Sequence, residues 1–416
     1  MSISEDTAVG PNLDFNPMIA PHRQNPHLFY AEARKRKVAI SPTLGMYVIT
    51  RYEDLMTVVN DPGTYSSSVA IPRIYDNPAE VVAELRGVPE TSMLVNEDEP
   101  LHRAVRKVFE PALSARRIRE LTPLMRDTAN SLIDSFESAE NADLHSQFAS
   151  PFVRKVLSAI IGFPVEDSAQ VQRWSDDQAI LFNPLAPTEE KVDAAREMRA
   201  YTDYLQELIN ARKIEPTGDL ISCLVHGTDK YPPLSNDQVH TLVRGSRVAG
   251  YDTTRDSILS TLLLMLRDRE LWEAVRSDSA RMLPRIMEEA LRRDAPHRGL
   301  LRLATRETEL GGASIPRGAV LFLLFGAGNR DDRMFPEPDS VKLDRPNVRK
   351  HLAFGDGLHR CPGEPTARVE IRVAIQTIMA RLPGLHLAPD FHPEYVASFL
   401  FRGLESLRVL VRGGVS

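Results

Sequence analysis

One short stretch, HLAFGDGLHRCPG at residues 351–363, constrains the fold of this chain more than any other. Cys361 lies among three glycines and precedes a helix-compatible segment, so its sulfur is predicted to project from a tight loop at a helix start. Free backbone N–H groups and the helix dipole favour a thiolate there. The glycines let the backbone approach a large flat ligand closely, while Phe354 can cover its underside and His359 can hold an anionic group on it.

The pattern F-G-x-G-x-H-x-C-x-G, which runs from Phe354 to Gly363, resembles the haem-binding loop of the cytochrome P450 family. The resemblance implies that the Cys361 thiolate is the fifth ligand of a haem b iron. It also implies a mainly α fold with small β-sheets, in which the haem lies between a long central helix and the cysteine-loop helix. An isolated cysteine in a Gly-rich turn is more often an ordinary buried thiol. Four further motifs in the order of the family favour the haem ligand.

Composition limits the class and compartment of the protein. The chain has 416 residues, of which 42% are hydrophobic, and no Gly/Ser linker or repeat divides it. We therefore expect an irregular extension over residues 1–24 and a single catalytic domain over residues 25–416. A net charge of −6 gives no reason to expect nucleic-acid binding. Only Cys223 and Cys361 occur, and the most apolar run, residues 258–266, is too short to span a bilayer, so we expect a cytoplasmic monomer without a membrane anchor.

A helical pattern of about thirty residues follows a capping box formed by Ser235 and Gln238. Its middle, AGYDTT at residues 249–254, combines Gly, Asp and two Thr, all of which weaken a helix interior. Such a conflict often marks a functional site, and a local opening of the helix there would free a carbonyl for a water and leave a groove for dioxygen. A kink that the fold merely tolerates is the alternative interpretation.

The same segment resembles the acid–alcohol pair of the family. The resemblance implies that Thr253 hydrogen-bonds dioxygen and that Asp252 relays protons to it, so both are assigned as catalytic residues. Gly245 lies one turn before Ala249 on the side expected to face the haem. We assign these two residues to the substrate pocket, where the missing side chain of Gly245 leaves space above the haem.

His102 and Arg106 lie four residues apart in DEPLHRAVRKVFEP, hence on one helical face, where they can together hold a carboxylate. Taken alone, such a pair more often belongs to a solvated face. The resemblance implies that this pair and Arg302, in an R-x-A motif, bind the haem propionates.

Glu289 and Arg292 form an E-x-x-R pair in RIMEEALRRDAP. Such pairs are common on helix surfaces and say little alone. At this position, between the long helix and the cysteine loop, the resemblance implies a buried structural network with Arg345 as its third member.

Three residues and one segment are assigned to the substrate pocket. Arg298 lies four residues before Arg302, at a position that can point into the cavity, although an arginine facing solvent or structure is an equal alternative. The resemblance places Leu400 and Phe401 in a terminal hairpin whose turn enters the pocket. Residues 62–96 are broken repeatedly by Pro and Gly, which is typical of a lid or a disordered segment, and the resemblance places them over the site.

These features predict a haem-thiolate monooxygenase that inserts one oxygen atom from O2 into a small or medium organic substrate. Hydroxylation is the default reaction, and O-dealkylation and epoxidation stay open. The resemblance implies that electrons come from a ferredoxin and its ferredoxin reductase, and that an acidic carrier docks on the cysteine side of the haem. Complementary charge on this chain would speed that encounter. The basic residues expected to form the docking face are Arg103, Lys107, Arg116, Arg117 and Arg119.

Two other functions stay open. A peroxide-driven or isomerising haem-thiolate enzyme needs no electron partner, but the pair Asp252–Thr253 serves dioxygen chemistry. A non-catalytic haem-binding sensor would need neither that pair nor a long lid.

Overall fold

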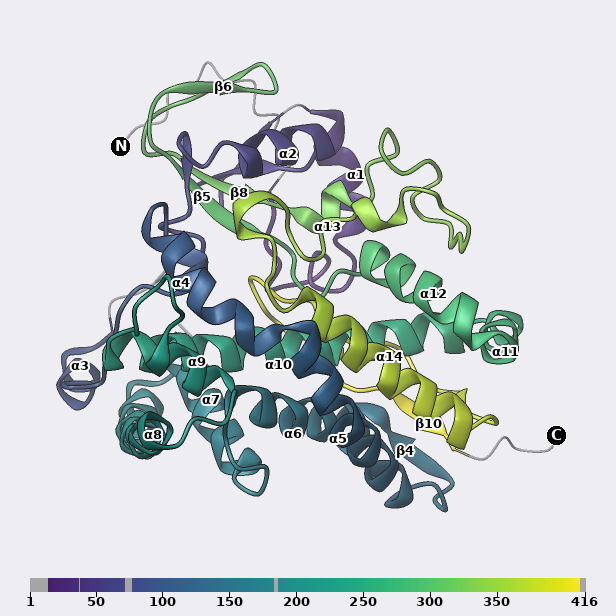
Figure 1. The fold of residues 1–416 in the computed structure, drawn as a ribbon. Coiled ribbons are helices and arrows are strands. Elements are labelled where there is room, and N and C mark those ends of the chain that lie inside the picture. Colours follow the sequence, from purple (N-terminus) through teal and green to yellow (C-terminus); the bar gives the residue numbers. More distant parts are fainter. Residues whose placement is uncertain (1–13, 37, 72–76, 183–185, 412–416) are drawn as a thin grey trace.

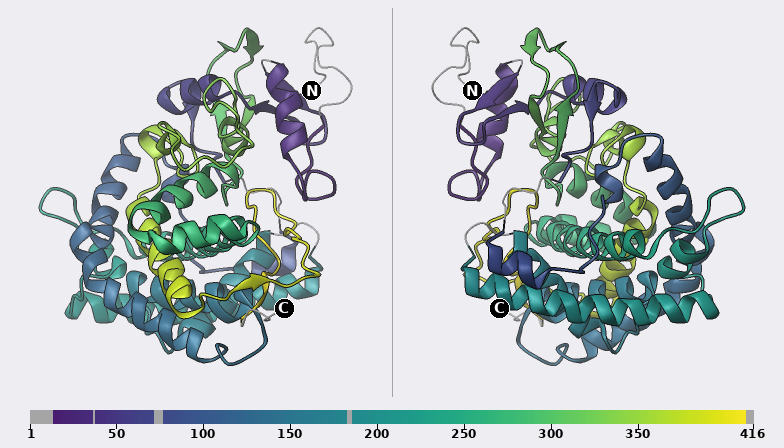
Figure 2. Two further views of the ribbon diagram at one scale, coloured as in Figure 1. Left: turned by 90° about the vertical axis from the view of Figure 1, so that its right-hand side faces the viewer. Right: turned by 90° about the vertical axis from the view of Figure 1, so that its left-hand side faces the viewer.

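The computed structural model describes residues 14–36, 38–71, 77–182 and 186–411. It confirms a mainly helical chain with small β-sheets, as the sequence predicts. Residues 1–13 of the predicted extension and residues 72–76 of the predicted lid lie outside the described residues. The largest sheet and helix α1 occupy one side of the molecule, and the long helices form the other side (Figures 1 and 2).

The longest helix, α10, runs through the middle of the helical part (Figure 1). Its predicted capping box is confirmed, because the Ser235 hydroxyl accepts from the Gln238 N–H and the Gln238 side chain accepts from the Ser235 N–H. The last nine residues of α10, 258–266, are mostly apolar and mostly buried. It packs against three helices that carry or support the predicted site. α10 spans Asn236–Leu266, and the three helices that it packs against are α6 (Ser150–Ile161), α12 (Ser279–Arg293) and α14 (Glu364–Arg381).

The other helices surround this centre. Four long helices, α5 to α8, follow one another between residues 115 and 214. Shorter ones lie at the sheet side or at the edges of the bundle (Figure 2). In chain order they are α1 (His27–Lys35), α2 (Tyr52–Asn60), α3 (Ala79–Glu84), α4 (Leu101–Phe109), α5 (Ala115–Asp134), α7 (Ser168–Phe182), α8 (Thr188–Ile214), α9 (Leu220–His226), α11 (Arg269–Ser277) and α13 (Phe325–Gly328).

The main sheet has the strand order β1-β2-β8-β5-β3. A hairpin forms its edge: Ala39 pairs with Val48, and Gly45 turns the chain with a φ of +63° that favours glycine. Strand β2 pairs in parallel with β8, so the chain returns to this sheet after the whole helical part. The strands are β1 (Ala39–Ser41), β2 (Met46–Ile49), β3 (Tyr65–Ser66), β5 (Leu300–Ala304) and β8 (Val320–Leu323); smaller sheets contain β4 (Asn141–Asp143), β9 (His386–Leu387) and β10 (Arg408–Leu410), and β6 (Thr308–Leu310) with β7 (Ala313–Ile315).

The described part of the N-terminal segment packs on the sheet. Phe15 is fully buried, and its ring stacks on Phe29 with the ring centres 4.7 Å apart and approaches Phe322 of β8. Burying one phenylalanine contributes roughly 1.5–3 kcal/mol. Residues from Phe15 onward therefore add to the core on the sheet side. Within the described ranges, no helix is both long enough and apolar enough to cross a membrane.

Candidate active site

The cysteine loop is a closed turn held from both ends. The backbone N–H of Cys361 donates to the carbonyl oxygen of Phe354 at 2.9 Å. Gly355 and Gly357 have φ values of +65° and +66°. At Gly357 a Cβ atom would lie 2.5 Å from the Val59 carbonyl oxygen, so only glycine lets the loop lie this close to α2. The fold thereby presents the Cys361 sulfur one turn before α14.

The ionisation of Cys361 differs from the sequence-based expectation. Burial raises the pKa of the thiol, although the backbone N–H groups of Gly363 and Glu364 act in the opposite direction. The start of α14 alone therefore does not yield a thiolate. An additional positive charge at the sulfur, such as a bound metal ion, is needed to deprotonate it.

A largely buried cluster of two imidazole rings and one guanidinium lies beside this loop. The rings of His102 and His359 are 4.2 Å apart, and both His102 and Arg302 are almost fully buried. Burial, together with the charges of His102, Arg302 and Arg106, lowers the pKa of His359 to about 3. Burial also lowers the pKa of Arg302 to about 10. The Nδ1 atom of His102 has no hydrogen-bond partner among the described residues.

Asp98 and Ser67 border this cluster, and no motif in the sequence indicated either residue. The Asp98 carboxylate accepts from the Ser67 N–H at 2.8 Å and attracts Arg302. The Ser67 hydroxyl lies 2.9 Å from Nε2 of His359. Oε1 of Glu99 lies 3.6 Å from Nδ1 of His102. The imidazole rings and the Arg302 guanidinium are nevertheless the kind of hydrogen-bonding groups that hold the carboxylates of a ligand.

Arg106 is placed beside the cluster but has protein partners. Its guanidinium donates to the carbonyl oxygens of Leu358 and Arg360 at 3.0 and 2.8 Å, and to the Glu110 carboxylate at 3.0 Å. It therefore clamps the cysteine loop onto α4. The sequence predicts direct propionate binding by Arg106, whereas in the structure two of its nitrogens serve the loop and Glu110.

One face of α10 is left open in the middle of the molecule. Ala249 is exposed although the helix around it is enclosed by other elements. Thr253 lies one turn further along, and its hydroxyl donates to the Ala249 carbonyl oxygen at 2.7 Å. The expected local opening is wrong: α10 is helical without a break from Asn236 to Leu266. The threonine hydroxyl adds its hydrogen bond to the carbonyl without unwinding the turn.

The described part of the predicted lid packs on this face of α10. A Cβ atom on Gly245 would lie 3.3 Å from the Met93 sulfur. The Thr91 N–H donates to the Thr241 hydroxyl at 3.0 Å, one turn earlier on the helix. Met93 was not predicted, because its contact with Gly245 joins residues 152 positions apart in the sequence. It closes the space that the missing side chain of Gly245 leaves.

The three predicted pocket residues outside α10 lie together, but Arg298 does not point into open space. Its side chain is 1% exposed, and its Nε donates to the Phe401 carbonyl oxygen at 3.1 Å. Burial lowers the pKa of the Arg298 guanidinium, and Tyr30 of α1 is the largest influence that raises it. Nε of Arg298 thus ties the segment before β5 to the C-terminal segment, while its two terminal nitrogens are buried without a hydrogen-bond partner among the described residues. Leu400 and Phe401 are only partly buried.

The predicted E-x-x-R residues meet in the core. The Glu289 carboxylate accepts from Arg292 at 2.8 Å and from Arg345 at 3.3 Å, and both Glu289 and Arg292 are fully buried. It also accepts from the Lys342 N–H at 3.1 Å. The network therefore fixes α12 to the irregular segment that leads into the cysteine loop.

The neighbouring acid, Glu288, forms a second network that the sequence analysis missed. Its carboxylate accepts from His351 and Arg368, and Arg368 lies over the Phe354 ring at 4.6 Å. Burial acts against its charge, but these partners lower the pKa of Glu288 to about 2. The signal was present as two consecutive glutamates in MEEALRR. The predicted cover residue Phe354 is thus held from α14 and α12.

Comparison with known proteins decides what this arrangement is. The sequence model of the cytochrome P450 family matches residues 21–383. The chain belongs to the cytochrome P450 family. It is 33% identical over 371 residues to the mycinamicin IV hydroxylase/epoxidase of Micromonospora griseorubida, covering 88% of this chain and 89% of that protein. It is 31% identical over 398 residues to the biotin biosynthesis cytochrome P450 of Bacillus subtilis, covering 93% and 96%.

The structure of this P450 agrees with solved relatives. The haem domain of the Tepidiphilus thermophilus P450 superposes with a TM-score of 0.88 at 26% identity, covering 95% of this chain and 96% of that one. The chain is therefore a cytochrome P450 monooxygenase, and the family implies haem as its cofactor. The residues present fit that cofactor: the rings of His102 and His359 and the buried Arg302 lie together beside the cysteine loop, and Ala249 is exposed on one face of α10.

Proposed function

We propose that Cys361 is the thiolate ligand of haem b in this P450, and that His102, Arg302 and His359 hold the haem carboxylates. When bound, the haem supplies dioxygen activation by a thiolate-ligated iron. The cluster of His102, His359 and Arg302 beside the cysteine loop carries this proposal, because Arg302 is a buried positive charge and all three side chains can hydrogen-bond a carboxylate. Arg106 adds charge and secures the loop, and Phe354 covers the cysteine side.

The α10 residues supply the proton chemistry in this proposal. Ala249 leaves the space next to the helix free, and Met93 packs on Gly245 at its edge. The resemblance to the family assigns Leu400 and Phe401 to the same pocket. The Thr253 hydroxyl can leave the Ala249 carbonyl and donate to dioxygen. Asp252, which is half-buried, is the acid that returns protons to this hydroxyl.

We infer a cytoplasmic enzyme that hydroxylates a small or medium organic substrate. The relative named a hydroxylase/epoxidase supports oxygen insertion and keeps epoxidation within the range of reactions. The apolar border of the pocket suits a largely apolar substrate. The non-catalytic sensor is disfavoured, because the comparisons identify the chain as a monooxygenase.

Replacing Thr253 with alanine is expected to separate electron consumption from product formation. The variant should keep its haem and oxidise NADPH, but release most of the reducing equivalents as hydrogen peroxide, because no hydroxyl remains to guide the proton. The measurement is product and peroxide formed per NADPH, with a substrate found by optical titration. Thr254→Ala, a change of the adjacent buried threonine, is the control and should stay coupled. Full coupling in Thr253→Ala would refute the assigned role.

We further propose that electrons arrive from an acidic ferredoxin-type carrier that docks over α4 and the start of α5. Residues 99–120 contain six Arg or Lys against three Glu. Several of these cations already pair with glutamates of their own helix, such as Arg103 with Glu99 at 3.2 Å and Arg116 with Glu120 at 2.9 Å. The surface is therefore less positive than the basic residues alone suggest, but an excess of positive charge remains.

The double change Arg103→Glu and Arg119→Glu is expected to slow reduction by the ferredoxin roughly tenfold at low salt, because complementary charge acts mainly on the association rate. Stopped-flow reduction at several salt concentrations measures this effect. The control is Arg196→Glu on α8, which reverses an exposed arginine elsewhere. An unchanged rate and salt dependence would rule out docking at this face.

A further inference from the structure

Two acids one helical turn apart on α10 share one guanidinium. Oδ1 of Asp252 lies 2.8 Å from a terminal nitrogen of Arg255, and Nε of Arg255 lies 2.8 Å from Oδ1 of Asp256. Arg255 is pinned from a third side, because its guanidinium lies over the Tyr251 ring at 5.3 Å. The acid that the proposed function assigns to proton delivery is therefore joined to a second, deeper carboxyl.

The second oxygen of Asp256 is buried without a hydrogen-bond partner. Asp256 is 2% exposed, and Oδ2 has no partner among the described residues. A Cβ atom at position 403 would lie 2.2 Å from Oδ2, so Gly403 keeps the space beside this oxygen clear. An unpaired buried carboxyl oxygen costs roughly 1–3 kcal/mol or more, so a salt bridge serving only structure would be expected to use both oxygens.

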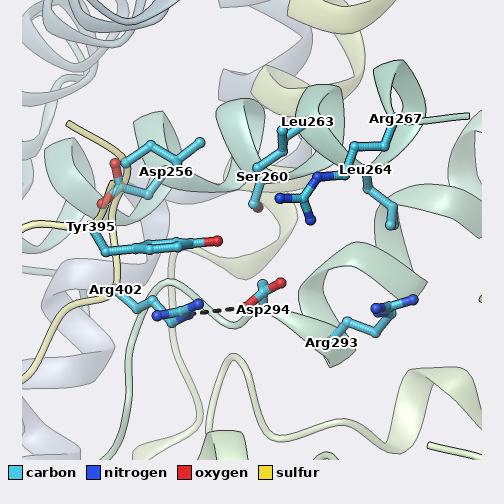
Figure 3. A pocket seen from close by; sticks show the side chains of 10 residues that line it. Asp256, Ser260, Leu263, Leu264, Arg267, Arg293, Asp294, Tyr395 and Arg402 are labelled. Carbon is cyan, nitrogen blue, oxygen red and sulfur yellow. Dashed lines mark hydrogen bonds and ion pairs between the residues drawn. The ribbon is translucent and has the colours of Figure 1, made fainter. Parts of the chain in front are cut away.

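Asp256 also lines a small cavity between α10, α12 and the C-terminal segment (Figure 3). The cavity has a volume of about 30 Å³, which is enough for a water molecule. Ser260, one turn beyond Asp256, supplies a hydroxyl, and Tyr395 and Arg402 close the opposite wall (Figure 3). The remaining lining residues are Leu263, Leu264, Arg267, Arg293, Asp294 and Leu404.

We propose that Asp256 is a second proton-carrying carboxyl of this P450, supplied by water in this cavity and coupled to Asp252 through Arg255. The proposal rests on the proposed function of Asp252. In this step the proton of Asp256 passes along a bridging water to the ionised Asp252 carboxylate. A proton from bulk solvent, relayed by water in the cavity, then restores Asp256, so that no hydroxide is left behind. Arg255 keeps all its protons, since a guanidinium does not deprotonate in proteins, and balances whichever carboxylate is charged. Asp256 acts through Asp252 and is a positioning residue.

The electrostatics around Asp256 agree with this role. Burial raises the pKa of Asp256 to about 6, against the lowering effect of Arg255. A group with such a pKa carries a proton part of the time near neutral pH, as a general acid requires. Charged and titratable groups from several elements face Asp256: Asp252 and Arg255 of α10, Arg267 directly after that helix, Arg293 at the end of α12, Asp294, Tyr395 and Arg402. The groups that face Arg255 besides Asp256 are His145, Tyr251 and Asp252.

Infrared difference spectroscopy of the ferric haem-loaded enzyme tests the protonation of Asp256 without turnover. The carbonyl stretch of a protonated buried carboxyl should appear as pH falls, with a midpoint near 6, and should be missing in Asp256→Asn. Asp237→Asn, an exposed carboxylate in the first turn of α10, is the control and should keep the band. A band that persists in Asp256→Asn, or no titrating band in the unsubstituted enzyme, would overturn the proposal.

Steady-state NADPH oxidation with ferredoxin and reductase gives the second readout. The rate should fall as pH rises through about 6, and Asp256→Asn should lower it roughly tenfold and remove this pH dependence. Asp256→Asn leaves Arg255 with one carboxylate and can cost haem binding, so a second variant, Arg255→Lys, is needed. A lysine keeps the positive charge but cannot bridge both acids. It should therefore shift the midpoint of the infrared titration of Asp256. An unshifted infrared midpoint in Arg255→Lys, together with an unchanged rate in both variants, would refute the coupling. A coupled Thr253→Ala enzyme would instead refute the proposed function, irrespective of Asp256.

Discussion

Replacing Cys361 with serine is expected to abolish oxygen insertion while leaving a folded protein. A serine hydroxyl does not ionise near neutral pH, so it cannot supply the anionic ligand that haem-thiolate chemistry requires. The loop itself should survive, because the bond from the residue 361 N–H to the Phe354 carbonyl and the Arg106 clamp do not use the sulfur. Product formation and haem content per protein measure the two parts of this expectation.

Cys223→Ser is the matched control, since it makes the same chemical change at the other cysteine. Cys223 packs in the helical core, where burial raises its thiol pKa to about 11 and leaves it a neutral thiol. This variant should keep its turnover. Oxygen insertion by Cys361→Ser at the rate of the unsubstituted enzyme would show that another residue is the ligand.

Replacing Glu289 with alanine is expected to prevent the accumulation of haem-loaded protein. The change leaves the fully buried Arg292 and the nearly buried Arg345 without their shared carboxylate. Breaking a buried ion pair by removing one partner costs about 3–5 kcal/mol, a large part of the stability of a typical domain. Haem content and thermal unfolding of the purified variant are the measurements.

The control for this experiment is Glu337→Gln, which removes an exposed carboxylate that pairs with Lys342 on the surface. Surface ion pairs contribute little, so this variant should match the unsubstituted protein. A stable, haem-replete Glu289→Ala protein would mean that the network is not required for the fold around the cysteine loop.

Features that depend on local sequence could be predicted well. The capping box at Ser235, the hairpin at Gly45 and the tight cysteine loop each follow from a few adjacent residues with strong backbone preferences. The haem-thiolate class also follows from short motifs, because the chemistry needs particular residue types at fixed spacing. The comparisons confirm that class.

Features that depend on packing could not be predicted. The net effect on the Cys361 pKa depends on how deeply the loop is buried, and the loop sequence does not state this. The prediction of a local opening in α10 is wrong, because the Thr253 hydroxyl donates to the Ala249 carbonyl oxygen within an unbroken helix. The direction of Arg298 is decided by the carbonyl of Phe401, more than a hundred residues later.

Long-range contacts also supply residues that no motif indicated. Met93 closes on Gly245, and Arg368 holds Phe354 through Glu288. These contacts join segments distant in sequence, so spacing rules carry no information about them. These contacts position side chains around a site whose central residues the motifs indicate.

The most direct test of the account is the absorption spectrum of the reduced protein under carbon monoxide, recorded beside that of Cys361→Ser. Thiolate ligation by Cys361 predicts a Soret band at the long wavelength diagnostic of a sulfur anion in the unsubstituted protein, and its loss in the variant. A band at the position typical of imidazole ligation, or identical spectra from the two proteins, would contradict the assignment of Cys361 as the haem ligand.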